Sequence, residues 1–171
     1  GAVVGVRVLA SRPDGMDDGQ AATQRQDPEN HIVDDPGDVE ALPADARWVT
    51  VLRQGDDVLE RVAARCPRLQ RLHVNCMEEF SRQPTNRVFA IAATLSELRE
   101  LQLVKTVHLD GTGIERLLDL PRLETLVLAM TRLKAASFSV LPRMPSLRVL
   151  DLSYSRGVDE DALRHIARCP G

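Results

Sequence analysis

Residues 147–170 read LRVLDLSYSRGVDEDALRHIARCP, with leucine at the first, fourth and sixth positions. In a short strand alternate side chains point to the same face, so Leu150 and Leu152 lie on one side of the chain. Residues 159–168 carry apolar side chains three and four positions apart, a spacing typical of a helix. Arg156-Gly157 between them is a turn signal. The stretch therefore predicts one short strand followed by one returning helix.

The same pattern occurs elsewhere in the chain. LQRLHV begins at Leu69, LRELQL at Leu98 and LETLVL at Leu123, and a weaker copy, ARWVTV, begins at Ala46. The starts at 46, 69, 98, 123 and 147 are therefore about 23 to 29 residues apart, within the range of known repeat families. One strand and one helix cannot bury their own apolar face, but stacked copies form a continuous core. We therefore expect an α/β solenoid of about five repeats over residues 46–171, with parallel short strands on the concave face and short helices on the convex face.

Segments between the strands support this phase. Their apolar spacing predicts helices over 57–65, 88–95, 114–120, 135–141 and 159–168. Proline cannot continue a helix, and it stands two residues before three of the repeat starts, at Pro67, Pro121 and Pro145. The strand register predicts two buried columns of side chains, one of Leu72, Leu101, Leu126 and Leu150, the other of Val74, Leu103, Leu128 and Leu152.

The pattern L-x-x-L-x-L at this period resembles the leucine-rich repeat. The last copy is similar to the cysteine-containing subclass found in F-box-type adaptors, on whose pattern fall Leu147, Leu150, Leu152, Val158, Leu163, Ile166, Ala167, Cys169 and Pro170. Ser155 replaces the first cysteine of that pattern. The copy from Ala46 repeats the ending as RVAARCP, whereas the copies from Leu98 and Leu123 end in DLP and RMP. The resemblance implies a protein-binding solenoid and, by analogy, the substrate-recognition part of a ubiquitin-ligase adaptor.

Residues 1–45 follow another rule. Counting residues 1–46 gives ten acids and three arginines, a net charge of −7, whereas 47–171 hold fifteen acids and nineteen bases, a net charge of +4. Val3, Val6 and Val8 have strand spacing, but Val3 lies 43 residues before Ala46, too far for one repeat. We therefore expect a degenerate N-terminal repeat or cap that contains an acidic, mobile insertion over about 12–38.

Composition limits the function. Hydrophobic residues make up 43% and charged residues 27%, so the chain can bury a core, but aromatic residues are only 3%, too few for base-stacking nucleic-acid modules. The three cysteines make a poor disulfide framework, and no apolar run is long enough to span a bilayer. We therefore expect an intracellular, cytoplasmic protein that binds neither nucleic acid nor membrane.

Four sets of residues are candidates for a chemical site, and each also has a simpler structural role. Cys66, His73 and Cys76 are zinc-ligand types, but the helix end and the strand place them apart, and the sequence offers no fourth ligand nearby. A nucleophilic arrangement of Cys76, His73 and Asp151 fails, because strands stacked at about 4.8 Å would separate the histidine and the aspartate by roughly 14 Å.

Gly111-Thr112-Gly113 could form an anion nest, but a turn is the simpler interpretation, because no phosphate-binding motif is completed. The last possibility is calcium at the acidic residues Asp14, Asp17, Asp18, Asp34 and Asp35, which lack the EF-hand pattern. We expect no catalytic site, cofactor or metal, and hence no enzyme.

The concave surface is the remaining candidate site. The third and fifth residues of each repeat, together with the strand exits, face this side and include the only Trp and the only Tyr. Trp, Tyr, Arg and Met are enriched at protein contacts. We therefore expect a protein partner to contact Trp48, Thr50, Arg71, His73, Glu100, Gln102, Lys105, Met130, Asp151 and Tyr154. Two alternatives stay open: in one, Trp48 serves only as part of a cap beneath the insertion, and in the other, the array is a structural scaffold or spacer.

The phase of the last repeat gives one more expectation. In the copy from Ala46, Cys66, Pro67 and Arg68 lead directly into the next strand, and Cys169, Pro170 and Gly171 occupy the same phase. The array is therefore expected to continue beyond 171. In the chain of 171 residues, the edge of the last repeat is expected to be exposed and to support self-association.

Overall fold

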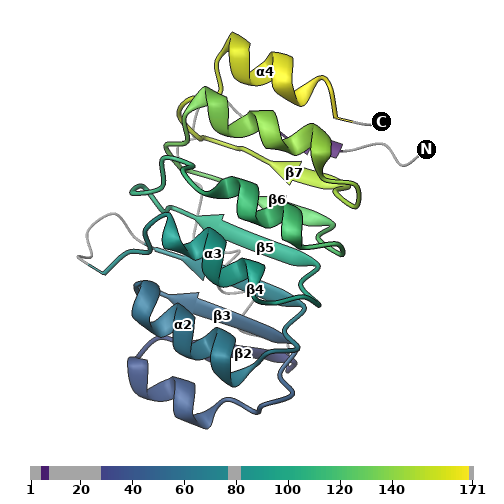
Figure 1. Cartoon of the computed structure of the whole chain (residues 1–171). Coiled ribbons are helices and arrows are strands. Elements are labelled where there is room, and N and C mark those ends of the chain that lie inside the picture. Colours follow the sequence, from purple (N-terminus) through teal and green to yellow (C-terminus); the bar gives the residue numbers. More distant parts are fainter. Residues whose placement is uncertain (1–4, 8–27, 77–81, 170–171) are drawn as a thin grey trace.

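Strands recur in the computed structural model at the expected phase. The structure describes residues 5–7, 28–76 and 82–169 (Figure 1). Five strands each begin two residues after a predicted repeat start: β3 (Trp48–Leu52), β4 (Arg71–Asn75), β5 (Glu100–Val104), β6 (Thr125–Val127) and β7 (Val149–Asp151). The repeats from Ala46 to the last copy therefore have the predicted register.

Each strand is followed by a short helix, so the unit is one strand and one return segment. The helices are α2 (Asp56–Arg65), α3 (Arg87–Ala93), η2 (Ile114–Asp119), η3 (Ala135–Arg143) and α4 (Glu160–Ile166), all within two residues of the predicted bounds. The η elements are 3₁₀ helices. In η3, Pro142 lies inside the helix, where it has no backbone N–H to donate to an α-helical bond.

The sheet is entirely parallel and has the strand order β1-β7-β6-β5-β4-β3-β2. The helices line its other side, and the units stack along one axis (Figure 1). Parallel strands joined by helices on one side, repeated in register, are the leucine-rich repeat solenoid that the sequence predicts. The fold is therefore an α/β solenoid.

The core lies between the sheet and the helices. The first predicted column is in register, with Leu72, Leu101, Leu126 and Leu150 paired along the strands and all buried. Val74, Leu103, Leu128 and Leu152 are also buried. Phe89 and Phe138, on two of the return helices, add the largest buried side chains. Both predicted columns are thus confirmed.

The exit from the strand uses the same backbone conformation in four repeats. Arg53, Lys105, Met130 and Tyr154 are the eighth residues of their repeats and have φ values of 57° to 60°. This left-handed conformation is uncommon for residues with a side chain. It turns the chain away from the sheet, and the four large side chains project from equivalent positions of their repeats.

The N-terminal part differs from the expectation in two ways. Residues 30–38 do not belong to a mobile insertion, because β2 (Asn30–Val33) pairs with β3 and the 3₁₀ helix η1 (Pro36–Ala41) packs beside α2. Val33 and Val39 are buried in the common core, which is the physical reason for their order. Residues 12–27 of the expected insertion lie outside the described residues.

The second difference concerns β1 (Gly5–Arg7). It does not lie beside the repeat from Ala46 but pairs in parallel with β7, at the opposite end of the sheet, and the Gly5 amide donates to the Arg148 carbonyl over 2.7 Å. The edge of β7, expected to be exposed, is therefore covered by a strand from the start of the chain. The Cα atom of Val6 is in register with that of Leu150, but the Val6 side chain remains exposed.

Among the described residues, no helix has the length and apolar character needed to cross a membrane.

Candidate binding surface on the concave face

Two lines of side chains cross the concave face from β3 to β7. The parallel register aligns Trp48, Arg71, Glu100, Thr125 and Val149 in one line, and Thr50, His73, Gln102, Val127 and Asp151 in the other. Both lines alternate with core positions, because successive side chains of a strand point to opposite faces. The sheet thus brings together residues that are far apart in the sequence.

A hydrogen-bonded chain connects three strands at one end of this surface. Trp48 Nε1 donates to His73 Nδ1 over 3.3 Å, and His73 Nε2 lies 2.8 Å from Glu100 Oε1. Because the indole can only donate, His73 Nδ1 must accept, so the neutral imidazole carries its proton on Nε2 and donates it to Glu100. The indole and imidazole rings also meet edge to face, with centroids 5.3 Å apart.

Glu100 is the central acceptor of this cluster. Gln102 Nε2 donates to Glu100 Oε1 over 2.5 Å, and Arg71 Nε lies 3.7 Å from Glu100 Oε2. The hydrogen bond from His73 lowers the pKa of the Glu100 carboxyl below its usual value, and burial opposes this shift. Glu100 is therefore held as a carboxylate by its neighbours.

Arg71 is the exposed member of the cluster. Its guanidinium carbon lies 5.0 Å from the centroid of the Trp48 ring, a cation–π distance, and half of its side chain remains exposed. Trp48 itself is partly exposed. These two side chains therefore form the part of the cluster that a partner can reach.

Thr50 and His73 have a different role from the one expected. Their exposed fractions are only 1% and 4%, so they position neighbours and are not accessible for partner contact. Thr50 Oγ1 donates to Asn30 Oδ1 over 3.0 Å. Asn30 lies on β2 and was missed by sequence reasoning, because the strand was assigned to the acidic insertion.

The other predicted site residues line the surface toward β7. Gln102, Lys105, Met130, Asp151 and Tyr154 are all partly exposed. The Asp151 carboxylate accepts from the amide and hydroxyl of Ser153, at 2.8 and 2.5 Å, so it is directed toward its own chain. Val127 and Val149 lie in the same region, where the surface becomes more apolar. Hence the concave face is charged over β3–β5 and mainly apolar over β6 and β7.

The residues weighed as a zinc site are separated in the structure. Cys66 is buried at the end of α2, where its thiol donates to the Pro43 carbonyl over 3.3 Å. Cys76 is buried after β4, and burial raises the pKa of its thiol to about 11. Within the described parts of the chain, no group of three or more His, Cys, Asp or Glu is placed to hold a metal ion. Asp14, Asp17 and Asp18, weighed as calcium ligands, lie outside the described residues.

Residues 111–113 form a turn, and the carboxylate of Asp110 accepts a hydrogen bond from its backbone. Asp110 accepts from the Thr112 amide over 3.0 Å, from Asn86 Nδ2 over 2.6 Å and from the Lys134 ammonium over 2.6 Å. These bonds, led by that from Lys134, hold the pKa of Asp110 well below its usual range. A fixed negative charge at this place disfavours the anion site weighed above.

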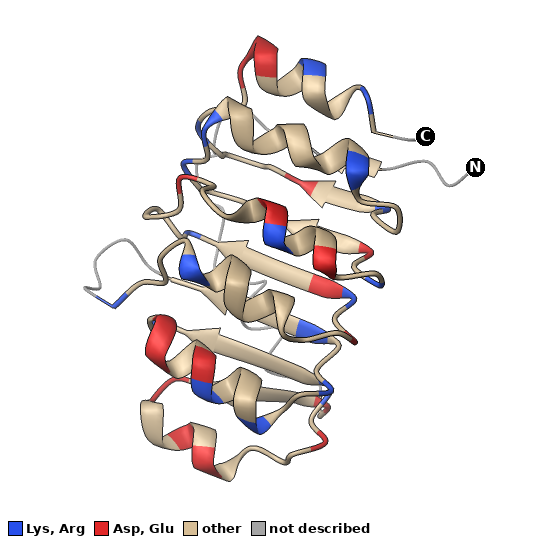
Figure 2. Ribbon diagram, in the orientation of Figure 1, with Lys and Arg blue, Asp and Glu red and all other residues tan. Residues whose placement is uncertain are grey.

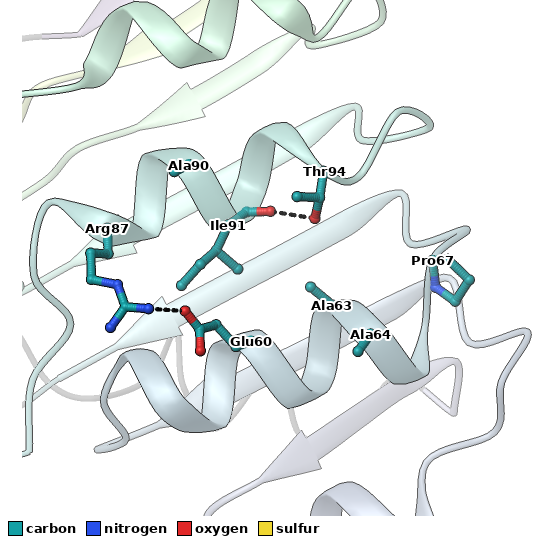
Figure 3. A pocket seen from close by; sticks show the side chains of 8 residues that line it. All are labelled: Glu60, Ala63, Ala64, Pro67, Arg87, Ala90, Ile91 and Thr94. Atoms are coloured by element: carbon teal, nitrogen blue, oxygen red, sulfur yellow. Dashed lines mark hydrogen bonds and ion pairs between the residues drawn. The ribbon is translucent and has the colours of Figure 1, made fainter.

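The convex face carries a groove between α2 and α3 that sequence reasoning did not identify. It has a volume of about 560 Å³ and a floor of small apolar side chains, and the ion pair between Arg87 and Glu60 crosses one end (Figure 3). Ala63, Ala64, Ala90 and Ile91 contribute most of its apolar lining. Small residues at facing positions of neighbouring helices are the signal that would have suggested it.

Ion pairs also connect successive repeats beside the strand starts. Glu97 pairs with Arg47 over 2.8 Å and with Arg68 over 3.2 Å, and Arg99 pairs with Glu124 over 2.6 Å. Acidic and basic residues consequently occur together in this part of the molecule (Figure 2). Such mixed charge does not form the single basic stripe that nucleic-acid binding requires.

Known proteins have little sequence similarity to this chain. No protein-family model matches the sequence, and no curated protein matches it. Among solved structures, an internalin from Listeria monocytogenes aligns with a TM-score of 0.38 and 15% sequence identity, over 72% of this chain and 45% of that chain. The chain thus spans less than half the length of that internalin.

Proposed function

We propose that the chain is a non-catalytic interaction module that binds a protein partner on the concave face of the solenoid. The observation that carries this proposal is the cluster of Trp48, Arg71, His73, Glu100 and Gln102. It offers an exposed arginine stacked on a partly exposed tryptophan, and both residue types are enriched in binding hot spots.

Preorganisation supports the same proposal. The indole N–H of Trp48 is already satisfied by His73, and His73 is held by Glu100, so the ring lies in one orientation before a partner arrives. A surface fixed in advance loses less side-chain entropy on binding. Buried His73 and Thr50 thereby contribute to recognition without touching the partner.

The partner is expected to complement both regions of the concave face, the charged region over β3–β5 and the mainly apolar region over β6 and β7. Over β3–β5 it would place a hydrogen-bonding or acidic group at Arg71, and over β6 and β7 it would place apolar side chains on Met130, Val149 and Tyr154. A purely charged partner would leave the second region uncovered. We therefore favour a folded protein or a peptide segment with both kinds of side chain.

Affinity capture with the 171-residue chain tests this proposal. The affinity for a captured partner should fall about tenfold or more in Arg71→Ala and in Trp48→Ala. Each variant is first checked for a native circular dichroism spectrum and cooperative unfolding. Arg116→Ala is a matched control, because Arg116 is an exposed arginine on the convex element η2. Retention of the same partner by folded Arg71→Ala and Trp48→Ala would contradict concave-face binding.

Two alternatives use the same experiment. The endings RCP at residues 65–67 and 168–170 favour, as a second candidate, the substrate-recognition part of an F-box-type ubiquitin-ligase adaptor. Capture of ubiquitin-ligase subunits together with the protein would support that candidate. A structural spacer, the third possibility, predicts that no partner depends on Arg71 or Trp48.

A further inference from the structure

Both ring nitrogens of His73 are engaged inside the concave cluster. Of the four histidines in the sequence, all of which the structure describes, only His73 is buried. Its Nδ1 accepts from the Trp48 indole over 3.3 Å, and its Nε2 donates to the Glu100 carboxylate over 2.8 Å. A ring nitrogen accepts a hydrogen bond only when it carries no proton. The cluster therefore has this arrangement only while His73 is neutral.

A second proton on His73 is incompatible with the hydrogen bond from Trp48. Both nitrogens of an imidazolium are donors, and the indole N–H is also a donor, so protonation places two donors 3.3 Å apart. A flip of the His73 ring exchanges its two nitrogens, but in either orientation the charged ring presents a donor to the indole. The conflict therefore follows from the chemistry of the two side chains and does not depend on the tautomer.

Two charged side chains lie on the strands around His73. Within β3, β4 and β5 they are Arg71 and Glu100, whose Nε and Oε2 atoms are 3.7 Å apart, and the next charged pair, Arg53 with Asp34, lies beyond the end of β3. The pKa of the Glu100 carboxyl lies below its usual value, so Glu100 keeps its charge over about pH 5 to 8, the range in which imidazoles titrate. A protonated His73 therefore forms a charge-assisted bond with Glu100 at Nε2, while its Nδ1 loses its acceptor role.

Movement of the Trp48 ring resolves the conflict at Nδ1. An unsatisfied buried donor costs free energy, and protonated His73 would have such a donor beneath the indole. Trp48 is partly exposed, so its ring can turn toward solvent, where water accepts from the indole and also reaches His73. The guanidinium carbon of Arg71 lies 5.0 Å from the indole centroid, so this cation–π contact depends on where the ring lies.

We propose that His73 is a pH-sensitive switch of the concave surface, whose protonation releases the Trp48 ring from its fixed orientation and separates it from Arg71, so that the partner binds less tightly in acid. The effect on the partner rests on the proposed function. The release of Trp48 does not, because it takes place in the free protein. The neutral form of His73 is the binding form.

Trp48 is the only tryptophan of the chain, so its signals report directly on the switch. In the 171-residue protein without a partner, acrylamide should quench the tryptophan fluorescence more strongly at about pH 5 than at about pH 8. In NMR spectra over the same range, the indole N–H resonance should shift with the same midpoint as the His73 ring protons. This comparison uses the unaltered chain, so it remains decisive where a variant does not fold.

Two histidine variants separate His73 from general effects of acid. His73→Gln carries an amide that can accept from the indole and donate to Glu100 but takes up no proton, so its tryptophan signals should not change over this range. His108→Gln removes an exposed histidine and should keep the full response. Native circular dichroism spectra and cooperative unfolding are required of both. A response that persists unaltered in folded His73→Gln would overturn the switch.

Partner binding gives the second readout. The affinity for a partner captured through Arg71 and Trp48 should fall about tenfold between about pH 8 and pH 5, as for the loss of a hot-spot contact, and should not change with pH in His73→Gln. Such a partner whose affinity does not change with pH, or falls equally with His73→Gln, would overturn the switch.

Tryptophan signals of the free chain that do not follow the His73 midpoint would also overturn the switch, even where Arg71→Ala confirms concave binding. Signals that follow this midpoint, together with a partner that ignores both Arg71 and Trp48, would support the release of Trp48 and contradict the proposed function. The two failures are therefore distinguishable.

Discussion

His73 is a buried polar side chain on a face of the sheet where exposed side chains were expected. It persists there because both ring nitrogens are satisfied, Nδ1 by the Trp48 indole and Nε2 by the Glu100 carboxylate. A buried polar group costs free energy only when it lacks a partner. At the residue scale, the concave site therefore depends on Glu100, the acceptor that His73, Gln102 and Arg71 share.

Replacing Glu100 with Gln should make the stability of the protein less sensitive to acid. The folded-state pKa of Glu100 lies below its ordinary value of 4.5, so its stabilising contribution is present above about pH 4.5 and is lost as the pH falls through the folded-state pKa. At pH 7 we expect Glu100→Gln to lower the free energy of unfolding by about 1.5 to 3 kcal/mol. Urea unfolding between pH 7 and pH 2 should show this difference shrinking toward acid. A difference that stays constant with pH would mean that the carboxylate is not stabilised by this cluster.

The three cysteines should react with alkylating reagents in a fixed order. Cys66 and Cys76 are buried and Cys169 is only partly buried, while burial raises the pKa of all three thiols, so accessibility sets the order. The thiolate is the reactive form, so iodoacetamide at pH 8 should modify Cys169 first and the other two only after unfolding in urea. Mass spectrometry of timed samples gives the order. Early modification of Cys76 in the folded protein would contradict its burial.

At the scale of the element, each strand contributes side chains to columns shared with its neighbours. Leu126 in β6 is buried between Leu101 and Leu150. Leu126→Ala should therefore cost about 2 to 5 kcal/mol in the free energy of unfolding. Leu163→Ala is the matched control, because the same atoms are removed from an exposed position, and it should change stability by less than about 0.5 kcal/mol. A cost below about 1 kcal/mol for Leu126→Ala in denaturant unfolding would show that this register is wrong.

Glycines in the turns between strand and helix differ in how close the neighbouring atoms lie to the position that a Cβ atom would take. Gly157 and Gly113 have nearly the same φ, 87° and 86°, but a Cβ on Gly157 would lie 1.8 Å from the Leu133 carbonyl oxygen, whereas its nearest neighbour at Gly113 would be 3.9 Å away. Gly113→Ala should cost about 1 to 2 kcal/mol from the backbone conformation alone.

Gly157→Ala should cost at least about 1 kcal/mol more than Gly113→Ala, because it adds a steric clash to the same conformational cost. Thermal and urea unfolding of both variants give the comparison. Equal costs would indicate that the approach of Leu133 is not required.

At the scale of the whole molecule, the beginning of the chain contributes to both ends of the sheet. β1 pairs with β7 and β2 pairs with β3, so the connection must cross six strand spacings, about 29 Å. Residues 8–29 provide 22 residues for this distance. At about 3.3 Å per residue, a connection shorter than about nine residues could not span this distance, and a replacement of equal length leaves both pairings possible.

Replacement by Gly-Ser linkers of equal length separates the two parts of the expected insertion. Replacing 12–27 should leave cooperative unfolding intact, as expected from its polar, acidic composition. Replacing 12–38 should lower stability by several kcal/mol, because it removes β2 and buried Val33, and a fully buried valine contributes about 1.5 to 3 kcal/mol. Guanidinium unfolding measures both. Equal stability of the two variants would contradict the packing of β2 on β3.

The amino-acid sequence by itself determined the repeat. The aliphatic side chains at the fourth and sixth positions of each copy must be buried in any stack of such units, so Leu72, Leu101, Leu126 and Leu150 were predictable from local periodicity. The exposed row with Trp48 and Arg71 followed from the same alternation. These features depend on residues near one another in the chain, where the pattern is strong.

Tertiary structure alone decided the places of β1 and β2 and the burial of His73. Strand pairing depends on which edge is free and which apolar side chains it can cover, and the spacing of Val6 or Val33 in the sequence does not carry that information. His73 is buried because Trp48 and Glu100, from two other strands, lie on either side of it. Contacts between residues distant in the sequence arise only when the repeats stack, because stacking sets which side chains become neighbours.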